Sequence, residues 1–279
     1  MKNKKKTPIG KIIAEIILFA VALIFAAPIF IIINYSFKTK KELYLGNPLS
    51  LPQSLNFENY ISAYKKLNLS VTFANTAIYT IVSVLILTIL CSAAAWAIAR
   101  NRGRFYRFSY IYFLVGILIP SQALFLPIYI VGYSTGMVNT QWGVIFMYVA
   151  TNVSFGVFLM TSFMSTVPIE IEEAAKLDGC SVYGTFFKIV LPLLKPAMAT
   201  LVILQAFQIW NEYLMSSLFV SNNKLKTMTV ALQSLFSAQS NDYSTAFGAI
   251  VISALPIAVL FISLQKYFIK GMTVGAVKG

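Results

Sequence analysis

The 279-residue sequence lacks histidine, contains only two cysteines, and has charged side chains at just 11% of its positions. Without histidine, the commonest general base and a principal metal ligand are both absent. The two cysteines, Cys91 and Cys180, are too few for a zinc cluster or a disulfide framework. We expect no disulfide between them, because Cys91 lies inside an apolar run. Most enzyme and metal-binding classes are therefore excluded.

A phosphate-binding loop is also missing. The only Gly-Lys pair, Gly10-Lys11, has no glycine five residues before it, so the pattern G-x-x-x-x-G-K-[ST] does not occur. We therefore expect this chain to bind neither ATP nor any other cofactor. The net charge of +13 could indicate a nucleic-acid partner, but the basic residues are spread between long apolar runs, so none is expected.

Apolar residues dominate what is present. They make up 58% of the chain, and the mean hydropathy is +0.76. A soluble domain has about 45–50% apolar residues, so this chain has more apolar surface than a core in water could bury. Runs of about 20 apolar residues, each long enough to cross a membrane, occur at Ile12–Ile33, 71–99, 108–131, 142–163, 197–220 and 247–268. The sequence predicts an all-α membrane protein with six transmembrane helices.

Prolines inside these runs are expected to mark bends rather than to prevent spanning. They are Pro28, Pro120, Pro127 and Pro256. The lysines before the first run resemble the start of a signal peptide, but the run is longer than such a segment and no clear cleavage site follows, so we interpret it as a retained first helix.

The distribution of Lys and Arg predicts the orientation. Fifteen of the 22 lie on the side that holds both termini, so both termini are expected in the cytoplasm, with lipid around the spans. We divide the chain into residues 1–70, containing the tail, the first helix and an external segment, residues 71–268, containing the other five spans, and a cytoplasmic tail at 269–279.

The cytoplasmic stretch between the fourth and fifth runs predicts a short helix outside the membrane. Ser165 or Thr166 can cap it, Pro168 suits its first turn, and Gly179 can close it in the left-handed conformation. Three acids near its start favour the positive end of the helix dipole. They are Glu170, Glu172 and Glu173.

This stretch carries a spaced pattern: Glu-Ala-Ala, three residues, Gly, nine residues, Ile, one residue, Leu-Pro. Its members are Glu173, Ala174, Ala175, Gly179, Ile189, Leu191 and Pro192. The pattern resembles that of the integral-membrane subunits of binding-protein-dependent ABC importers. The resemblance implies that segment 168–192 is the coupling helix that sits in a cleft of a separate ATPase subunit. An ordinary capped surface helix is the alternative interpretation.

Further segments narrow the resemblance to carbohydrate importers of the maltose and multiple-sugar type, and to the smaller of their two paired permeases. These are 51–52 with 57–60, 119–122, 210–213 and the C-terminal 265–279. The resemblance implies a permease domain over 71–268, a second permease as heterodimer partner, and an ATPase dimer that binds ATP and Mg²⁺. It also implies an external sugar-binding protein and a location in a bacterial cell membrane.

On a continuous helix through the fifth run, Gln205, Gln208 and Glu212 share a stripe about 80° wide with Ser216. Polar groups at membrane depth usually face a bundle interior or a water-filled path. The candidate residues for a sugar path are therefore Gln205, Gln208, Trp210, Asn211, Glu212 and Tyr213. Alternatively, these polar groups only hold helices together.

Two other functions compete with an ABC permease. Glu212 could serve as the ion site of a secondary transporter driven by an ion gradient, but that function leaves the Glu-Ala-Ala pattern unexplained. A membrane-embedded enzyme would need paired carboxylates or a nucleophile with its base, and neither is visible. We expect a transport subunit rather than an enzyme.

Overall fold

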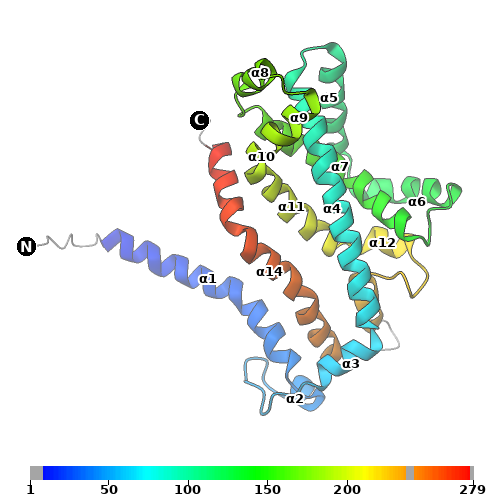
Figure 1. The fold of residues 1–279 in the computed structure, drawn as a ribbon. Helices are drawn as coiled ribbons and strands as arrows, with labels where there is room; N and C mark the ends of the chain where they lie inside the picture. The colour runs from blue at the N-terminus through cyan, green and yellow to red at the C-terminus, as the bar shows by residue number, and fades with distance from the viewer. Residues whose placement is uncertain (1–8, 237–241, 277–279) are drawn as a thin grey trace, which may run out of the picture. The chain divides into compact units, whose positions relative to one another are not determined.

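The computed structural model describes residues 9–236 and 242–276. Over these ranges the backbone forms helices joined by turns and contains no strand, which confirms the all-α fold class (Figure 1). The described residues form two compact units. The small unit comprises 1–68 with 232–254, and the large unit comprises 69–231 with 255–279.

The small unit contains α1 (Ile9–Ser36), α2 (Lys40–Leu45), α3 (Glu58–Lys66), η3 (Ser234–Phe236) and the first turns of α14 (Tyr243–Ala276). A capping box starts α2, because the Thr39 hydroxyl accepts the Glu42 amide while the Glu42 carboxylate accepts the Thr39 amide at 2.8 Å. Lys38 is fully buried in this unit, and its Nζ donates to the Asn47 carbonyl at 3.0 Å. The segment between the first two spans is thus ordered by its own polar groups.

Within the described residues, four helices are long and apolar enough to cross a membrane: Gly10–Ser36, α4 (Leu69–Arg100), α7 (Gln141–Met164) and Tyr243–Lys266. Two bent helix pairs bring the number to six if each pair is one span. The first joins α5 (Arg104–Leu118) to η1 (Ser121–Leu124) and α6 (Phe125–Ser134). The second joins α9 (Val182–Gly184), η2 (Thr185–Val190) and α10 (Leu191–Leu193) to α11 (Lys195–Trp210).

The third predicted span is not one continuous helix. After α5 ends at Leu118, Ile119 is extended, and the two halves are bent by 100°. A residue before proline is disfavoured in the α region, so Pro120 accounts for the break. Pro28 and Pro256, in contrast, lie inside the unbroken helices α1 and α14.

The fifth predicted span is also interrupted, so the expectation of one helix over 197–220 is wrong. The helix α11 ends at Trp210, and α12 (Leu214–Phe219) begins after Asn211, Glu212 and Tyr213. The physical reason is that the Glu212 carboxylate caps a new helix start, as described below. The loop that follows leads into α13 (Met228–Gln233).

The core of the large unit forms where α4 packs on α7, with α11 against both. Gly156 of α7 faces Cys91 of α4 so closely that an added Cβ would collide with the Cys91 sulfur. Small residues permit such close approach between membrane helices. Within this unit α8 (Ile169–Leu177) lies near the C-terminal end of α4 (Figure 1).

Candidate functional site

The predicted coupling helix corresponds to α8, which follows α7 almost directly. Its N-cap is Pro168, and no side chain caps it. The hydroxyls of Ser165 and Thr166 donate to carbonyl oxygens near the end of α7, at 2.7 and 2.8 Å. The expectation that either residue would cap α8 is therefore wrong, because both hydroxyls belong to the turn that terminates the preceding helix.

Gly179 closes α8 as the sequence predicts, with a φ of +79°. The amide of Gly179 donates to the Lys176 carbonyl at 3.0 Å, and the amide of Cys180 donates to the Ala175 carbonyl at 2.9 Å. These two bonds define a Schellman motif, which turns the chain sharply away from the helix axis. The next helix starts at once, because the Ser181 hydroxyl caps α9.

The residues of the spaced pattern differ in exposure. Glu173, Ala174 and Pro192 are exposed, Ile189 and Leu191 are half-buried, and Ala175 is buried. Exposed apolar side chains, which no sequence pattern predicted, lie beside them. Leu177 is 90% exposed, and Val182 and Tyr183 follow Gly179 at 61% and 79%. We call Glu173, Ala174, Leu177, Val182 and Tyr183 the exposed surface of the coupling segment.

Glu172 does not belong to this surface. It is buried, its Oε1 accepts the Arg100 Nε at 2.7 Å, and its Oε2 accepts the Trp96 indole N–H at 2.8 Å. The basic group that pairs with Glu172 is thus Arg100 of the same chain.

The candidate sugar-path residues surround the break after α11. Both carboxylate oxygens of Glu212 accept backbone amides at the start of α12, from Met215 at 2.7 Å and from Ser216 at 2.9 Å. The Tyr148 hydroxyl of α7 donates to the same carboxylate at 3.4 Å. Glu212 is therefore a helix cap, and its acceptor capacity is largely used inside the chain.

The break separates the members of the predicted polar stripe. Gln205 is fully buried and its amide donates to the Asn152 carbonyl at 3.3 Å, whereas Gln208 is exposed. Asn211 is exposed and Tyr213 half-buried at the break itself. The prediction of one continuous polar face is wrong, because the 100° periodicity applies only while the helix continues.

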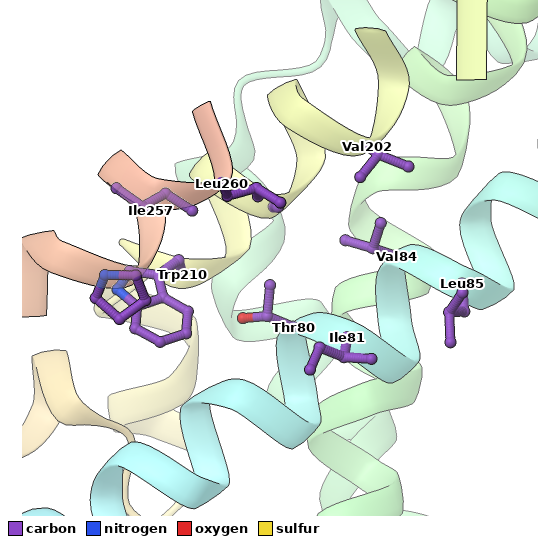
Figure 2. Close-up of a pocket in the computed structure, with 10 residues that line it drawn as sticks. Thr80, Ile81, Val84, Leu85, Val202, Trp210, Ile257 and Leu260 are labelled. Carbon is purple, nitrogen blue, oxygen red and sulfur yellow. The ribbon is translucent and has the colours of Figure 1, made fainter. Parts of the chain in front are cut away.

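Trp210 lines an apolar cavity of about 280 Å³ inside the large unit. In Figure 2 its ring lies near Ile257 and Leu260 of α14, while Thr80, Ile81 and Val84 project from α4. Phe73 contacts the indole edge-on, with ring centroids 5.7 Å apart. Trp210 thus packs among apolar neighbours rather than in a polar stripe.

Within residues 9–236 and 242–276, no three Cys, Asp or Glu side chains gather in a way that could hold a metal ion. The large unit is a bundle of apolar helices with one break at residues 119–120 and another at residues 211–213, and an ordered helical segment lies at one end. These features define a multi-pass membrane protein.

The chain belongs to the family described as binding-protein-dependent transport system inner membrane component, whose members it matches over residues 88–274. It is thus a permease subunit of an ABC transporter, a transport component rather than an enzyme. Such a permease works with a partner permease, an ATPase and a binding protein. The ion-gradient alternative is not supported.

Similar proteins extend over nearly the whole chain. One is the probable starch degradation products transport system permease protein AmyC of Thermoanaerobacterium thermosulfurigenes, 34% identical, with 98% of this chain and 99% of that protein covered. Another is the melibiose/raffinose/stachyose import permease protein MelC of Bacillus subtilis, 36% identical over 90% of this chain and 91% of that protein. A bacterial ABC transporter that imports the acidic polysaccharide alginate shares the fold, with a TM-score of 0.81, 23% identity, and 95% and 100% of the two chains covered.

Proposed function

We propose that this chain forms one half of the transmembrane path for a neutral sugar or oligosaccharide and couples that path to an ATPase through segment 168–192. The observation that carries the proposal is the exposed surface of the coupling segment. A small residue, an acid and three apolar side chains are presented there at the end of a helix bundle. Two relatives are named for starch degradation products and for melibiose, raffinose and stachyose, which supports a sugar substrate.

The partners follow from this assignment. A second, different permease completes the path, an ATPase dimer receives the coupling segment, and an external binding protein delivers the sugar. Ala174 allows close approach of the ATPase, and Glu173 can pair with its basic groups. Leu177 and Tyr183 supply apolar contact, which is the main source of affinity in most protein interfaces.

The coupling segment faces the cytoplasm, and so do both termini, in a bacterial cell membrane. The excess of Lys and Arg on that side supports this orientation. The ion pair between Arg100 and Glu172 places α8 at the C-terminal end of α4, close in the chain to where α5 begins. The basic residues in this part of the chain are Arg100, Arg102, Arg104 and Arg107.

Among the candidate path residues, we assign two different roles. Gln208, Asn211 and Tyr213 are at least partly exposed at the break and can offer amides, a hydroxyl and a ring to a sugar. Gln205, Trp210 and Glu212 are engaged within the chain and hold the break in place. The permease domain at 71–268 then contains both the path and the coupling segment.

The decisive experiment is purification of the complex in mild detergent, followed by substitution of the exposed surface. Wild-type chain is expected to recover one ATPase and one second permease. Replacing Glu173 with Lys and Ala174 with Trp should release the ATPase and abolish uptake, while the chain still inserts and retains its partner permease. A matched control is Arg107→Gln, an exposed change on α5 outside segment 168–192. Undiminished ATPase binding and uptake by the Glu173/Ala174 variant would refute the coupling role.

A further inference from the structure

The helix α4 is continuous over 32 residues and contains no proline. A helix rises about 1.5 Å per residue, so residues 76 and 100 are roughly 36 Å apart along its axis. Each end is hydrogen-bonded, through buried or half-buried side chains, to a segment that lies far away in the sequence. The two ends thus tie together parts of the large unit that are far apart in space.

At its C-terminal end, α4 contacts α8 and the residues on either side of it at three points. Arg100 donates to the Glu172 carboxylate at 2.7 Å and, through Nη2, to the Val167 carbonyl at 2.8 Å. Trp96 donates to the other Glu172 oxygen, and its ring lies 5.2 Å from that of Phe186 in η2. Trp96 and Arg100 are four residues apart and therefore share one face of α4.

These contacts attach α4 before, within and after α8. The side chains of Glu172 and Arg100 are only 3% and 16% exposed. Separating a buried pair leaves uncompensated charge, so α8 cannot slide away from α4 without a large cost. A displacement of α8 is therefore passed to α4 rather than absorbed between them.

At its N-terminal end, α4 holds the loop that precedes α13. The Asn75 amide donates to the carbonyls of Lys224 and Lys226, at 2.9 and 3.1 Å. The Thr76 hydroxyl accepts the Met228 amide at 2.8 Å, and the Tyr79 hydroxyl donates to the Leu225 carbonyl at 3.2 Å. All these bonds go to the loop backbone, so they fix its path whatever its side chains are.

We propose that α4 is a rigid connecting rod that carries motion of the coupling segment to the loop 224–228 on the opposite side of the membrane. Glu172 and Arg100 are then positioning residues at the ATPase end, and Asn75 is a positioning residue at the external end. The proposal rests on the proposed function, since α8 must receive the motion from an ATPase. The contacts at both ends of α4 form the kind of contiguous, rigid network that can carry coupling between distant sites, and the experiment below tests whether it does.

The test uses the full importer complex in sealed vesicles, with Asn223→Cys in the loop as a reporter. Asn223 is exposed and next to Lys224, while Cys91 is buried and Cys180 lies at the coupling segment. A membrane-impermeant maleimide measures the labelling rate with and without a nonhydrolysable ATP analogue inside the vesicles. ATP binding is expected to change this rate at least about 5-fold, the lower end of typical couplings between sites.

Glu172→Gln and Asn75→Ala should each reduce this ATP-dependent change to near zero while the ATPase still co-purifies and binds the analogue. Arg107→Gln, an exposed change on α5, is the matched control and should keep it. If Glu172→Gln impairs assembly, the charge-free double variant Arg100→Gln/Glu172→Gln replaces it and should also lose the response.

A full response in the double variant and in Asn75→Ala, or no response in the wild-type complex, would overturn the connecting rod while leaving the ATPase-binding role intact. Failure of the wild-type chain to recover an ATPase would instead refute the proposed function. If these contacts only stabilised the fold, the variants would reduce assembly of the complex. They would not leave ATP binding intact while removing the change in labelling rate of the loop.

Discussion

Segment 168–192 and the break at 210–214 both interrupt helical structure in the large unit, but different causes produce them. In the first, Gly179 and Ser181 set the turn and the new start with bonds to residues at most five positions away. In the second, no glycine or proline lies between the two helices, and the Glu212 carboxylate organises the restart. A break that depends on turn-forming residues such as glycine can be predicted from the sequence. A break that depends on one carboxylate within an apolar run cannot be predicted in this way.

One acid from each region, Glu173 and Glu212, shows a further contrast. Glu173 is exposed at the coupling segment, whereas Glu212 is bonded to two amides and a tyrosine hydroxyl. Polar groups inside a membrane must find partners before they can serve a ligand. An intramembrane acid is therefore first to be tested as a backbone cap and only then as a binding group.

The largest effect is expected at Gly179. Apart from Gly179 and its two chain neighbours, no described atom lies within 4 Å of a Cβ built there, and the left-handed conformation accepts Asn or Asp far better than a β-branched residue. Gly179→Val should strain α8, and Gly179→Asp should abolish uptake by placing a charge against the ATPase. Gly179→Asn, which keeps the turn and adds no charge, should retain more transport than either. Sugar uptake by reconstituted complexes measures this order, and equal loss in all three variants would show that bulk alone is decisive.

A smaller effect, on stability rather than transport, is expected at Glu212. Glu212→Ala removes the two hydrogen bonds that the Met215 and Ser216 amides donate at the start of α12. This should lower the free energy of unfolding by about 2–3 kcal/mol, since hydrogen bonds to charged groups are the stronger ones. Glu212→Gln keeps one acceptor oxygen and should lose about half as much. Thermal unfolding in detergent tests this, with exposed Gln208→Ala as the control, expected within about 0.5 kcal/mol of wild type. Unchanged stability combined with weakened uptake would instead place Glu212 on the substrate path.

Asp242 lies just before α14 and outside the membrane spans. Its carboxylate can therefore be compared with that of Glu212, in a setting outside the membrane. Burial would raise its pKa, but hydrogen bonds from Lys66, Thr245 and Ser244 and the charge of Lys40 together hold the pKa well below its usual 3.8. Because the folded pKa lies below the unfolded one, Asp242 contributes stability above the usual pKa and loses it as the pH falls through the folded value.

Asp242→Asn should therefore lower the free energy of unfolding at neutral pH by about 1–2 kcal/mol, the least of these effects because both lysines are largely exposed. The difference from wild type should shrink as the pH falls below the usual pKa. Unfolding in detergent at pH 7 and at lower pH values measures both. A difference that grows on acidification would contradict the assigned pKa direction.

Much of the fold could be predicted from sequence because its signals are local. The apolar runs 12–33, 71–99 and 142–163 match α1, α4 and α7 to within about three residues at each end, whereas α14 begins before the run 247–268 and continues past its end. The closing conformation of Gly179 followed from residue type alone. The spaced Glu-Ala-Ala pattern led to the permease family.

The remaining features depend on contacts between distant residues. Glu172 and Glu173 are adjacent glutamates in α8. Glu172 is the one held inside, by Trp96 and Arg100, which lie 76 and 72 residues earlier in the chain. The helical wheel failed at the fifth span because its geometry presumes the continuity that Glu212 interrupts. The exposed apolar side chains of Leu177 and Tyr183 carry no periodicity that could have distinguished them from core residues.

The turn after α8 leaves the chain with a natural chemical reporter. Cys180, half-buried, follows Gly179, while Cys91 is enclosed between α4 and α7. A thiol reagent added to the solubilised chain should therefore modify one position, directly beside the exposed surface of the coupling segment. The rate of that single reaction, followed by mass spectrometry, gives a footprint of whatever occupies the segment without any substitution being introduced.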